Sequence, residues 1–335
     1  MKKLELRRLY PAIALLFLTP LVAEYLLGSL TFGELVLFPI MILMYGAGAL
    51  FFRELARRND RGWPTIIMLG FAYALIEEGL ATQSLFNPHY LGLNLLEKGF
   101  IPSLGIGGPW SVYVIILHVA WSIAVPIALV ESLFPEQRLK PWLGKVGFAI
   151  SGALYVFGVG LIAFGTWQKE RFEASATQLS ITALIALVTA AAAFVLFRRV
   201  ALDRDVTGSR RVEKALALAA FVAGSAFHLV AQFGSAYLSP LAAVLIELLL
   251  PISMLVGIRL TRRHVAWAYA YTDALMIGGL LAYCLLGFFL SVRLHGSESV
   301  SGQFIPVIII LSLIGIIVFR RIRKRNEMTA EKIYG

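Results

Sequence analysis

The sequence Ala74-Leu75-Ile76-Glu77-Glu78-Gly79-Leu80-Ala81-Thr82 places two adjacent carboxylates inside a segment that is otherwise apolar enough to cross a lipid bilayer. A charged side chain at membrane depth costs roughly 2.5 kcal/mol or more on insertion scales. Such residues therefore mark sites of binding, transport or catalysis by default. We expect Glu77 and Glu78 to lie at the functional site, within a membrane-spanning helix.

The composition of the whole chain is that of a membrane protein. Hydrophobic residues make up 59% of the 335 residues and charged residues 15%, and the mean hydropathy is +0.79. Soluble domains have about 45–50% apolar residues. We predict an all-α fold, a polytopic transmembrane helix bundle that forms one integral membrane domain over residues 1–335 and has the lipid bilayer as its surroundings.

About 20 apolar residues are needed for one helix to cross a bilayer. Ten such segments follow one another along the chain. The predicted spans cover residues 9–28, 34–53, 64–84, 110–133, 146–166, 177–197, 214–237, 240–259, 268–292 and 303–320.

The basic residues gather on one side of this map. With a cytoplasmic amino terminus, the cytoplasmic segments hold 26 of the 30 Lys and Arg residues, as is typical of cytoplasmic loops in membrane proteins. We therefore expect a multi-pass protein of the cell (plasma) membrane with both termini in the cytoplasm. This asymmetry accounts for the net charge of +10, and no nucleic-acid partner is expected.

The segment 85–109 is a long connection on the extracytoplasmic side that is rich in apolar residues, Gly and Pro. Loops longer than about 12–15 residues are usually functional or disordered, and this segment is too apolar for disorder. We expect it to fold back on the outer face as a lid or re-entrant segment. A plain connector packed on the neighbouring helix ends is the alternative.

The map assigns a depth to each polar residue. Glu77 and Glu78 lie roughly 10 Å below the outer boundary, at a rise of 1.5 Å per residue. By the same count His118, His228 and Glu247 stand at a similar level in three other spans. We predict that these side chains share one site, with Glu77, Glu78, His118 and His228 as its catalytic residues.

Adjacent side chains on an α-helix point about 100° apart. We therefore expect one glutamate of the pair to face the centre of the site and the other to contact a neighbouring helix. Further polar side chains on the same spans are predicted to support the site: Thr82, Ser122, Ser225, Gln232 and Glu247. Two other acidic residues, Glu24 and Asp273, fall close to span ends and are expected near the head groups.

Imidazole and carboxylate groups around an open position are typical of catalytic zinc, whose bound water becomes the nucleophile. Glu78, His118 and His228 are the predicted zinc ligands, and the second carboxylate would act as a general base. In a metal-free version, a Glu–His pair activates water directly, and Gln232 or a serine hydroxyl stabilises the oxyanion. A third interpretation is structural, because polar groups also link helices by hydrogen bonds inside membranes.

The order of these residues resembles the CAAX-protease and bacteriocin-processing (CPBP) family of intramembrane proteases. The family's first motif is Glu-Glu-x-x-x-Arg, its second Phe-x-x-x-His and its third His-x-x-x-Asn or similar. Glu77 and Glu78 match the first pair, His118 stands for the second motif, and His228 with Gln232 stands for the third.

The resemblance implies hydrolysis of a peptide bond within or near the membrane. One of the two glutamates would activate water, and the two histidines would orient the water or bind a metal. The substrate would be a membrane peptide or a small molecule. Two positions differ from the family's pattern, because Thr82 stands at the arginine position and Val114 at the phenylalanine position.

A secondary transporter is the main alternative. Ten spans divide into two halves of five, which would lie in inverted orientation, as in many carriers. The sequences Ala74-Leu75-Ile76-Glu77 and Val244-Leu245-Ile246-Glu247 occupy equivalent positions in these halves. The glutamates and histidines would then relay protons or bind a cation. A binding subunit without chemistry and a lipid-modifying enzyme are also compatible with the sequence.

Overall fold

The structure is a computed structural model and describes residues 2–197 and 208–334. Within these ranges, ten helical segments are long and apolar enough to cross a membrane. The predicted all-α bundle of ten spans is therefore confirmed. The basic segment expected on the cytoplasmic side over residues 198–214 falls partly on residues 198–207, which lie outside the described residues.

Helices account for nearly all of the regular structure. The α-helices are α1 (Lys2–Pro20), α2 (Phe38–Met41), α3 (Ala47–Arg58), α4 (Trp63–Leu75), α5 (Gly108–Leu117), α6 (Val125–Leu133), α7 (Lys145–Glu170), α8 (Ala176–Leu196), α9 (Arg210–Tyr237), α10 (Pro240–His264), α11 (Tyr269–His295) and α12 (Val300–Tyr334). Strands β1 (Phe100–Ile101) and β2 (Ile106–Gly107) form an antiparallel pair.

Four of the spans in the described chain each contain a π-helical segment next to an α-helix. These segments cover Leu21–Leu26, Ile42–Gly46, Ile76–Ala81 and His118–Ala124. Short 3₁₀-helices cover Phe32–Leu37, Tyr90–Gly92, Pro135–Gln137 and Ser297–Ser299. The first span thus runs from α1 into a π-helical segment, and the fourth joins α5 to α6 through another.

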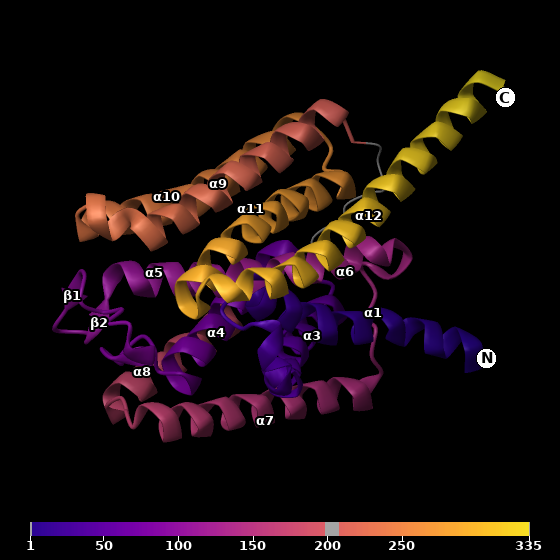
Figure 1. The fold of residues 1–335 in the computed structure, drawn as a ribbon. Helices are drawn as coiled ribbons and strands as arrows, with labels where there is room; N and C mark the ends of the chain where they lie inside the picture. The colour runs from indigo at the N-terminus through magenta and orange to yellow at the C-terminus, as the bar shows by residue number, and fades with distance from the viewer. Residues whose placement is uncertain (1, 198–207, 335) are drawn as a thin grey trace.

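The bundle has three layers (Figure 1). Helices α9, α10, α11 and α12 lie on one side, and α7 and α8 lie on the other side of a central group formed by α1 and α3–α6. The outer helices expose apolar side chains such as Val156, Leu187 and Leu249. Since lipid tails are as apolar as these side chains, the exposed surfaces suit a bilayer.

Both chain termini lie at one end of the bundle, and the β1–β2 pair lies at the opposite end (Figure 1). The connection that was expected as a lid over residues 85–109 lies at this opposite end and continues to Gly107, where α5 follows at Gly108. It contacts the end of α7 and the start of α8, because the backbone N–H of Leu91 donates to Glu170 at 3.2 Å and Gln178 donates to the carbonyl of Leu104 at 3.1 Å.

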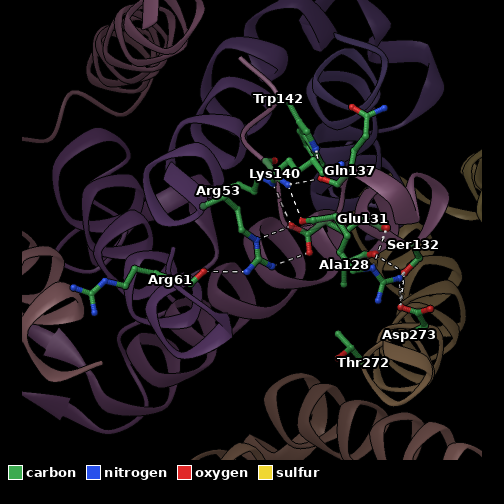
Figure 2. Close-up of polar contacts among 12 residues, drawn as sticks. Arg53, Arg61, Ala128, Glu131, Ser132, Gln137, Lys140, Trp142, Thr272 and Asp273 are labelled. Carbon is green, nitrogen blue, oxygen red and sulfur yellow. Dashed lines mark hydrogen bonds and ion pairs between the residues drawn. The ribbon is translucent and has the colours of Figure 1, made fainter. Parts of the chain in front are cut away.

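At the end of the bundle that carries the termini, a network of buried ion pairs joins α3 to α6 (Figure 2). The carboxylate of Glu131 accepts from Arg53 at 3.2 Å and from Arg57 at 2.9 and 2.8 Å. Arg53 also donates to Glu54 and to backbone carbonyls of the 137–140 turn. All four side chains are almost fully buried, so the pairs and their hydrogen bonds must replace lost hydration.

Asp273, at the start of α11, belongs to the same region rather than to the head-group surface expected from its place near a span end. Its carboxylate accepts from Ser132 at 2.6 Å and from Arg138 at 2.9 Å, and it pairs with Arg321 of α12. Figure 2 shows Asp273 facing Ser132. The sequence placed Asp273 close to one end of its span. It did not show that Arg138 and Arg321 pack against this carboxylate.

Candidate functional site

The site is built on the four π-helical segments of the described chain. Each of them carries polar side chains of the same cluster: Glu24 on Leu21–Leu26, Tyr45 on Ile42–Gly46, Glu77 and Glu78 on Ile76–Ala81, and His118 and Ser122 on His118–Ala124. π-helical turns frequently occur at functional sites, because they interrupt the regular i→i−4 hydrogen bonds and redirect side chains. The convergence of these four segments in one place identifies this part of the bundle as the candidate site.

The imidazole of His118 lies between the two glutamates. Its Nε2 is 2.6 Å from Oε1 of Glu78, and its Nδ1 is 3.1 Å from Oε2 of Glu77. The three side chains are buried, with exposed fractions of 2% for Glu77, 6% for Glu78 and 4% for His118. The structure therefore differs from the expectation that one glutamate would point away, since both contact the same histidine.

Hydroxyl groups hold Glu78 and His118 in place. Oε2 of Glu78 accepts from Thr82 at 3.1 Å and forms a short contact with the hydroxyl of Ser84. Ser122 lies 2.9 Å from Nδ1 of His118. Thr82, at the position of the arginine in the CPBP motif, thus donates to the carboxylate of Glu78 directly, and Ser122 lies beside the imidazole.

Glu77 has a different environment, because its Oε2 accepts no hydrogen bond from the described residues. The ring centroids of Tyr45 and Tyr73 lie 6.1 and 6.2 Å from that of His118. Tyr155 of α7 stacks on Tyr73 at 5.7 Å, and within the described chain neither of these two hydroxyls has a hydrogen-bond partner. Oε2 of Glu77 thus has the imidazole of His118 as a charged neighbour at 3.1 Å, and the hydroxyls of Tyr73 and Tyr155 are buried in the same part of the bundle.

Glu24 is a third carboxylate of the cluster. It accepts from the hydroxyl of Ser29 at 2.5 Å, and the hydroxyl of Tyr45 lies within hydrogen-bonding reach of both Glu24 and Glu77. The charges of Glu24 and His118 interact. Sequence reasoning placed Glu24 near the head groups because it is close to a span end, although its position within an apolar span was the same signal that identified Glu77.

The connection at the end opposite the termini reaches toward this cluster through Tyr90. Its side chain is partly buried. The negative charges of Glu78, Glu24 and Glu77 act on its hydroxyl group. Burial, together with these carboxylates, raises the pKa of the Tyr90 hydroxyl well above its ordinary value. The Tyr90 hydroxyl therefore stays neutral.

His228 does not belong to the group of ligand atoms around His118. Three residues bring such atoms within 4.8 Å of one another, and these are Glu77, Glu78 and His118. His228 lies among aromatic rings instead, 4.5 Å from Trp121 and 5.3 Å from Tyr283 between ring centroids. Of the predicted zinc ligands Glu78, His118 and His228, the structure thus brings the first two together, and Glu77 rather than His228 lies beside them.

The other predicted supporting residues lie with His228 or beyond it. Gln232 donates to the hydroxyl of Tyr113 at 3.5 Å and accepts from Arg293 at 2.6 Å, so it is not placed to stabilise an oxyanion at His118. The hydroxyl of Ser225 is buried without a hydrogen-bond partner in the described residues. Glu247 is buried beside a separate small cavity. These side chains lie at a similar depth along their spans, but they do not meet at His118.

The group of Glu77, Glu78 and His118 has the composition of a metal centre or of a metal-free water-activating site. Catalytic zinc takes three protein ligands from imidazole and carboxylate groups and keeps one position for water. Without a metal, the same imidazole and carboxylates can accept a proton from water. Three carboxylates around a single imidazole also favour a cation at this place, since buried charges must be balanced.

Comparisons with known proteins identify the chain at the level of a family. The model of an uncharacterised membrane protein family matches residues 13–326. No curated protein matches the chain, and no solved structure matches it.

Proposed function

The chain belongs to this uncharacterised membrane protein family, and from the geometry of its site we propose that it is an intramembrane hydrolase that activates water at Glu77, Glu78 and His118. The observation that carries the proposal is the pairing of two buried carboxylates with one imidazole: Oε2 of Glu77 lies 3.1 Å from Nδ1 of His118, and Oε1 of Glu78 lies 2.6 Å from Nε2. A water molecule bound there would lose its proton to a carboxylate–imidazole pair, as general base catalysis requires.

The residues around Glu77 have distinct roles in this proposal. Glu78 orients the imidazole of His118 through the 2.6 Å contact to Nε2. Thr82 fixes the other oxygen of Glu78. The hydroxyl of Tyr73 lies beside Glu77, and it is the donor that we propose for the oxygen on which negative charge develops, since such donors stabilise the transition state of acyl transfer.

For a metal-bound form of the site we propose zinc, held by Glu77, Glu78 and His118, which would take the place of the direct contacts between the glutamates and the imidazole. Their ligand atoms lie within 4.8 Å of one another, and a bound zinc ion would balance the negative charge and lower the pKa of its water toward neutrality. The hydroxyl of Ser122 on Nδ1 of His118 would then fix the ring, as hydrogen bonds to ligating histidines commonly do.

The resemblance to CPBP proteases supports a peptide bond as the bond that is cut. The depth of the site supports a membrane peptide as the substrate, because the surrounding helices are apolar and face lipid. Tyr90 and the connection that carries it lie near the site, and we propose that this connection acts as its lid.

Hydrolysis tests the proposal directly. The purified chain in lipid nanodiscs is incubated with a library of fluorogenic membrane peptides, and the rate is compared with those of Glu77→Gln, Glu78→Gln and His118→Ala. We expect each variant to lose at least about a hundredfold in rate, the lower range for removing a general base. Glu173→Gln, an exposed glutamate in the α7–α8 connection, is the matched control. Equal rates in all variants would contradict the proposal.

A cation carrier is the second candidate, and Glu24 is the observation that favours it. Three carboxylates and one imidazole in an apolar bundle suit a transported cation as well as a zinc ion. Reconstituted proteoliposomes loaded with a pH-sensitive dye would report proton-coupled uptake. Uptake that is lost in Glu24→Gln and Glu77→Gln, together with no peptide hydrolysis in the wild-type protein, would establish the carrier in place of the hydrolase.

We also propose that the chain lies in the plasma membrane with both termini in the cytoplasm. The excess of Lys and Arg on the side of the termini supports this orientation, and both termini lie at one end of the bundle. The native Cys284 is buried, so single cysteines at Ser103 and Glu327 can be labelled from outside whole cells. We expect an impermeant maleimide to label Ser103→Cys at once and Glu327→Cys only after permeabilisation.

A further inference from the structure

A second, smaller polar site lies apart from the cluster on the π-helical segments. It is a cavity of about 40 Å³ between α9, α10 and the start of α5. Val230 and Ala231 of α9, Ala243 of α10 and Pro109 give it apolar walls, and Glu247 and Lys98 also line it. A cavity needs only about 10–15 Å³ to admit one water molecule, so this one has room for a small polar group.

The carboxylate of Glu247 is buried in the wall of this cavity without a partner. Its exposed fraction is 1%, and neither of its oxygens accepts a hydrogen bond from the described residues. A buried carboxylate without hydrogen bonds is strongly unfavourable, so such groups are normally paired. The geometry therefore leaves a place for a donor that enters the cavity and binds this carboxylate.

We propose that the cavity binds the primary ammonium group of a zwitterionic ligand, whose anionic group lies beside Lys98. An ammonium group offers three N–H donors, enough to satisfy both oxygens of Glu247 at once. Lys98 adds a positive charge at the exposed edge of the lining, where a phosphate or carboxylate of the ligand would remain at the surface. The ligand thus places each of its charges beside the opposite charge of the protein.

The lining argues against other cations. Hard metal ions such as Ca²⁺ and Mg²⁺ take about six or more oxygen ligands, whereas Glu247 is the one described side chain in the lining that supplies oxygen. A choline group has no N–H donor, and its three methyl groups make it far bulkier than an ammonium group. The cavity should therefore distinguish ethanolamine from choline head groups.

Two sources offer this chemistry. One is the head group of phosphatidylethanolamine, and the exposed Leu241 and Leu245 near the start of α10 would then lie beside its acyl chains. The other is a soluble zwitterion such as phosphoethanolamine. Because Lys98 and Pro109 of the lining lie just before β1 and just after β2 in the chain, we expect both sources to reach the cavity from the membrane boundary.

Lipid retention tests the proposal without any assay of hydrolysis, so it stands or falls separately from the proposed function. The full chain is purified from nanodiscs that contain equal amounts of phosphatidylethanolamine and phosphatidylcholine, and the lipids that remain bound are counted by native mass spectrometry. We expect phosphatidylethanolamine to be enriched about tenfold, which corresponds to about 1.4 kcal/mol. The enrichment should disappear in Glu247→Gln and weaken in Lys98→Gln, and Glu173→Gln should keep it.

A cavity-filling variant protects the test against a failure of Glu247→Gln to fold. Ala243→Leu keeps the carboxylate but occupies the space of the ligand, and we expect it to lose the enrichment as well. In phosphatidylcholine nanodiscs, added phosphoethanolamine should raise the unfolding temperature of the wild-type protein if the source is soluble, since a ligand stabilises the folded state that binds it. Enrichment unchanged in both Glu247→Gln and Ala243→Leu, or neither enrichment nor stabilisation in the wild-type protein, would overturn the proposal.

Discussion

Glu78 and His118 are separated by 40 residues in the chain, yet Oε1 of Glu78 lies 2.6 Å from Nε2 of His118. Both residues stand on π-helical segments. A π-helical turn contains more residues than an α-helical one, so neighbouring side chains are turned less far apart. This explains why the adjacent Glu77 and Glu78 both reach one imidazole, which regular helices would make difficult.

The first prediction concerns metal binding. We expect the purified protein to bind one zinc ion per chain, because Glu77, Glu78 and His118 supply the ligands. His118→Ala removes the imidazole and should lower the zinc affinity by at least about tenfold, the smaller loss known even for residues that only support ligands. Competition with a chromogenic chelator measures the affinity.

His228→Ala is the matched control for this measurement. It removes an equally buried histidine, which lies among the rings of Trp121 and Tyr283 rather than beside the carboxylates. We expect its zinc affinity to equal that of the wild-type protein. A loss of zinc in His228→Ala but not in His118→Ala would reverse the assignment of the two histidines.

The second prediction concerns Glu24. Glu24→Gln keeps the shape of the side chain but removes a negative charge that interacts with His118. It also weakens the hydrogen bond between the hydroxyl of Tyr45 and this side chain. We expect zinc affinity and hydrolysis to fall about tenfold, in the range of other changes beside metal ligands. Glu34→Gln is the control, since Glu34 lies outside the cluster and accepts from the backbone of Thr31. Equal effects of the two variants would show that Glu24 acts only through overall charge.

The spans could be predicted from the sequence because they depend on local hydrophobicity, and the Glu77–Glu78 pair stood out because it lies inside an apolar span. The observed spans begin and end close to the predicted ones, for example Gly108–Leu133 where 110–133 was expected. Depth could also be counted along each helix. Lateral position could not, because a rise per residue says nothing about which helices are neighbours. His118 and His228 therefore appeared as partners, although they lie in different contact groups.

The tyrosines and Glu24 were missed for two separate physical reasons. Tyr45 and Tyr73 look like ordinary apolar residues of a span, and only packing shows that they surround His118. Glu24 carried a clear signal, a carboxylate in an apolar segment, but its closeness to the span end favoured the head groups. No pattern within a single sequence predicts the π-helical segments that bring these residues together.

The third prediction concerns the close approach of two helices beside the site. A Cβ atom at Gly46, next to Tyr45, would overlap the backbone carbonyl of Leu16 in α1. Gly46→Ala must therefore push α1 away, and overpacking of this kind costs about 1–3 kcal/mol. We expect a lower thermal unfolding temperature. Gly160→Ala in α7 is the control, because its Cβ would meet no atom within 4 Å. Equal stability of the two variants would show that α1 can shift freely.

The fourth prediction concerns the ion network at the end of the bundle that carries the termini. Glu131→Gln removes the charge that Arg53 and Arg57 share, and both arginines are buried, with exposed fractions of 0% and 3%. Removing one partner of a buried pair is strongly destabilising, by about 3–5 kcal/mol, because the remaining charge loses its compensation.

The exposed pair of Arg323 and Glu327 gives the matched control for this variant. Their N–O distance of 2.9 Å is close to that of Arg57 and Glu131, but their side chains are 71% and 60% exposed. Exposed pairs contribute only about 0–1 kcal/mol, since water solvates both charges after the pair is broken. Chemical denaturation in mild detergent should therefore show a large loss of stability for Glu131→Gln and almost none for Glu327→Gln. If Glu131→Gln were as stable as Glu327→Gln, water would have to reach Arg53 and Arg57. That outcome would contradict the burial of these two arginines.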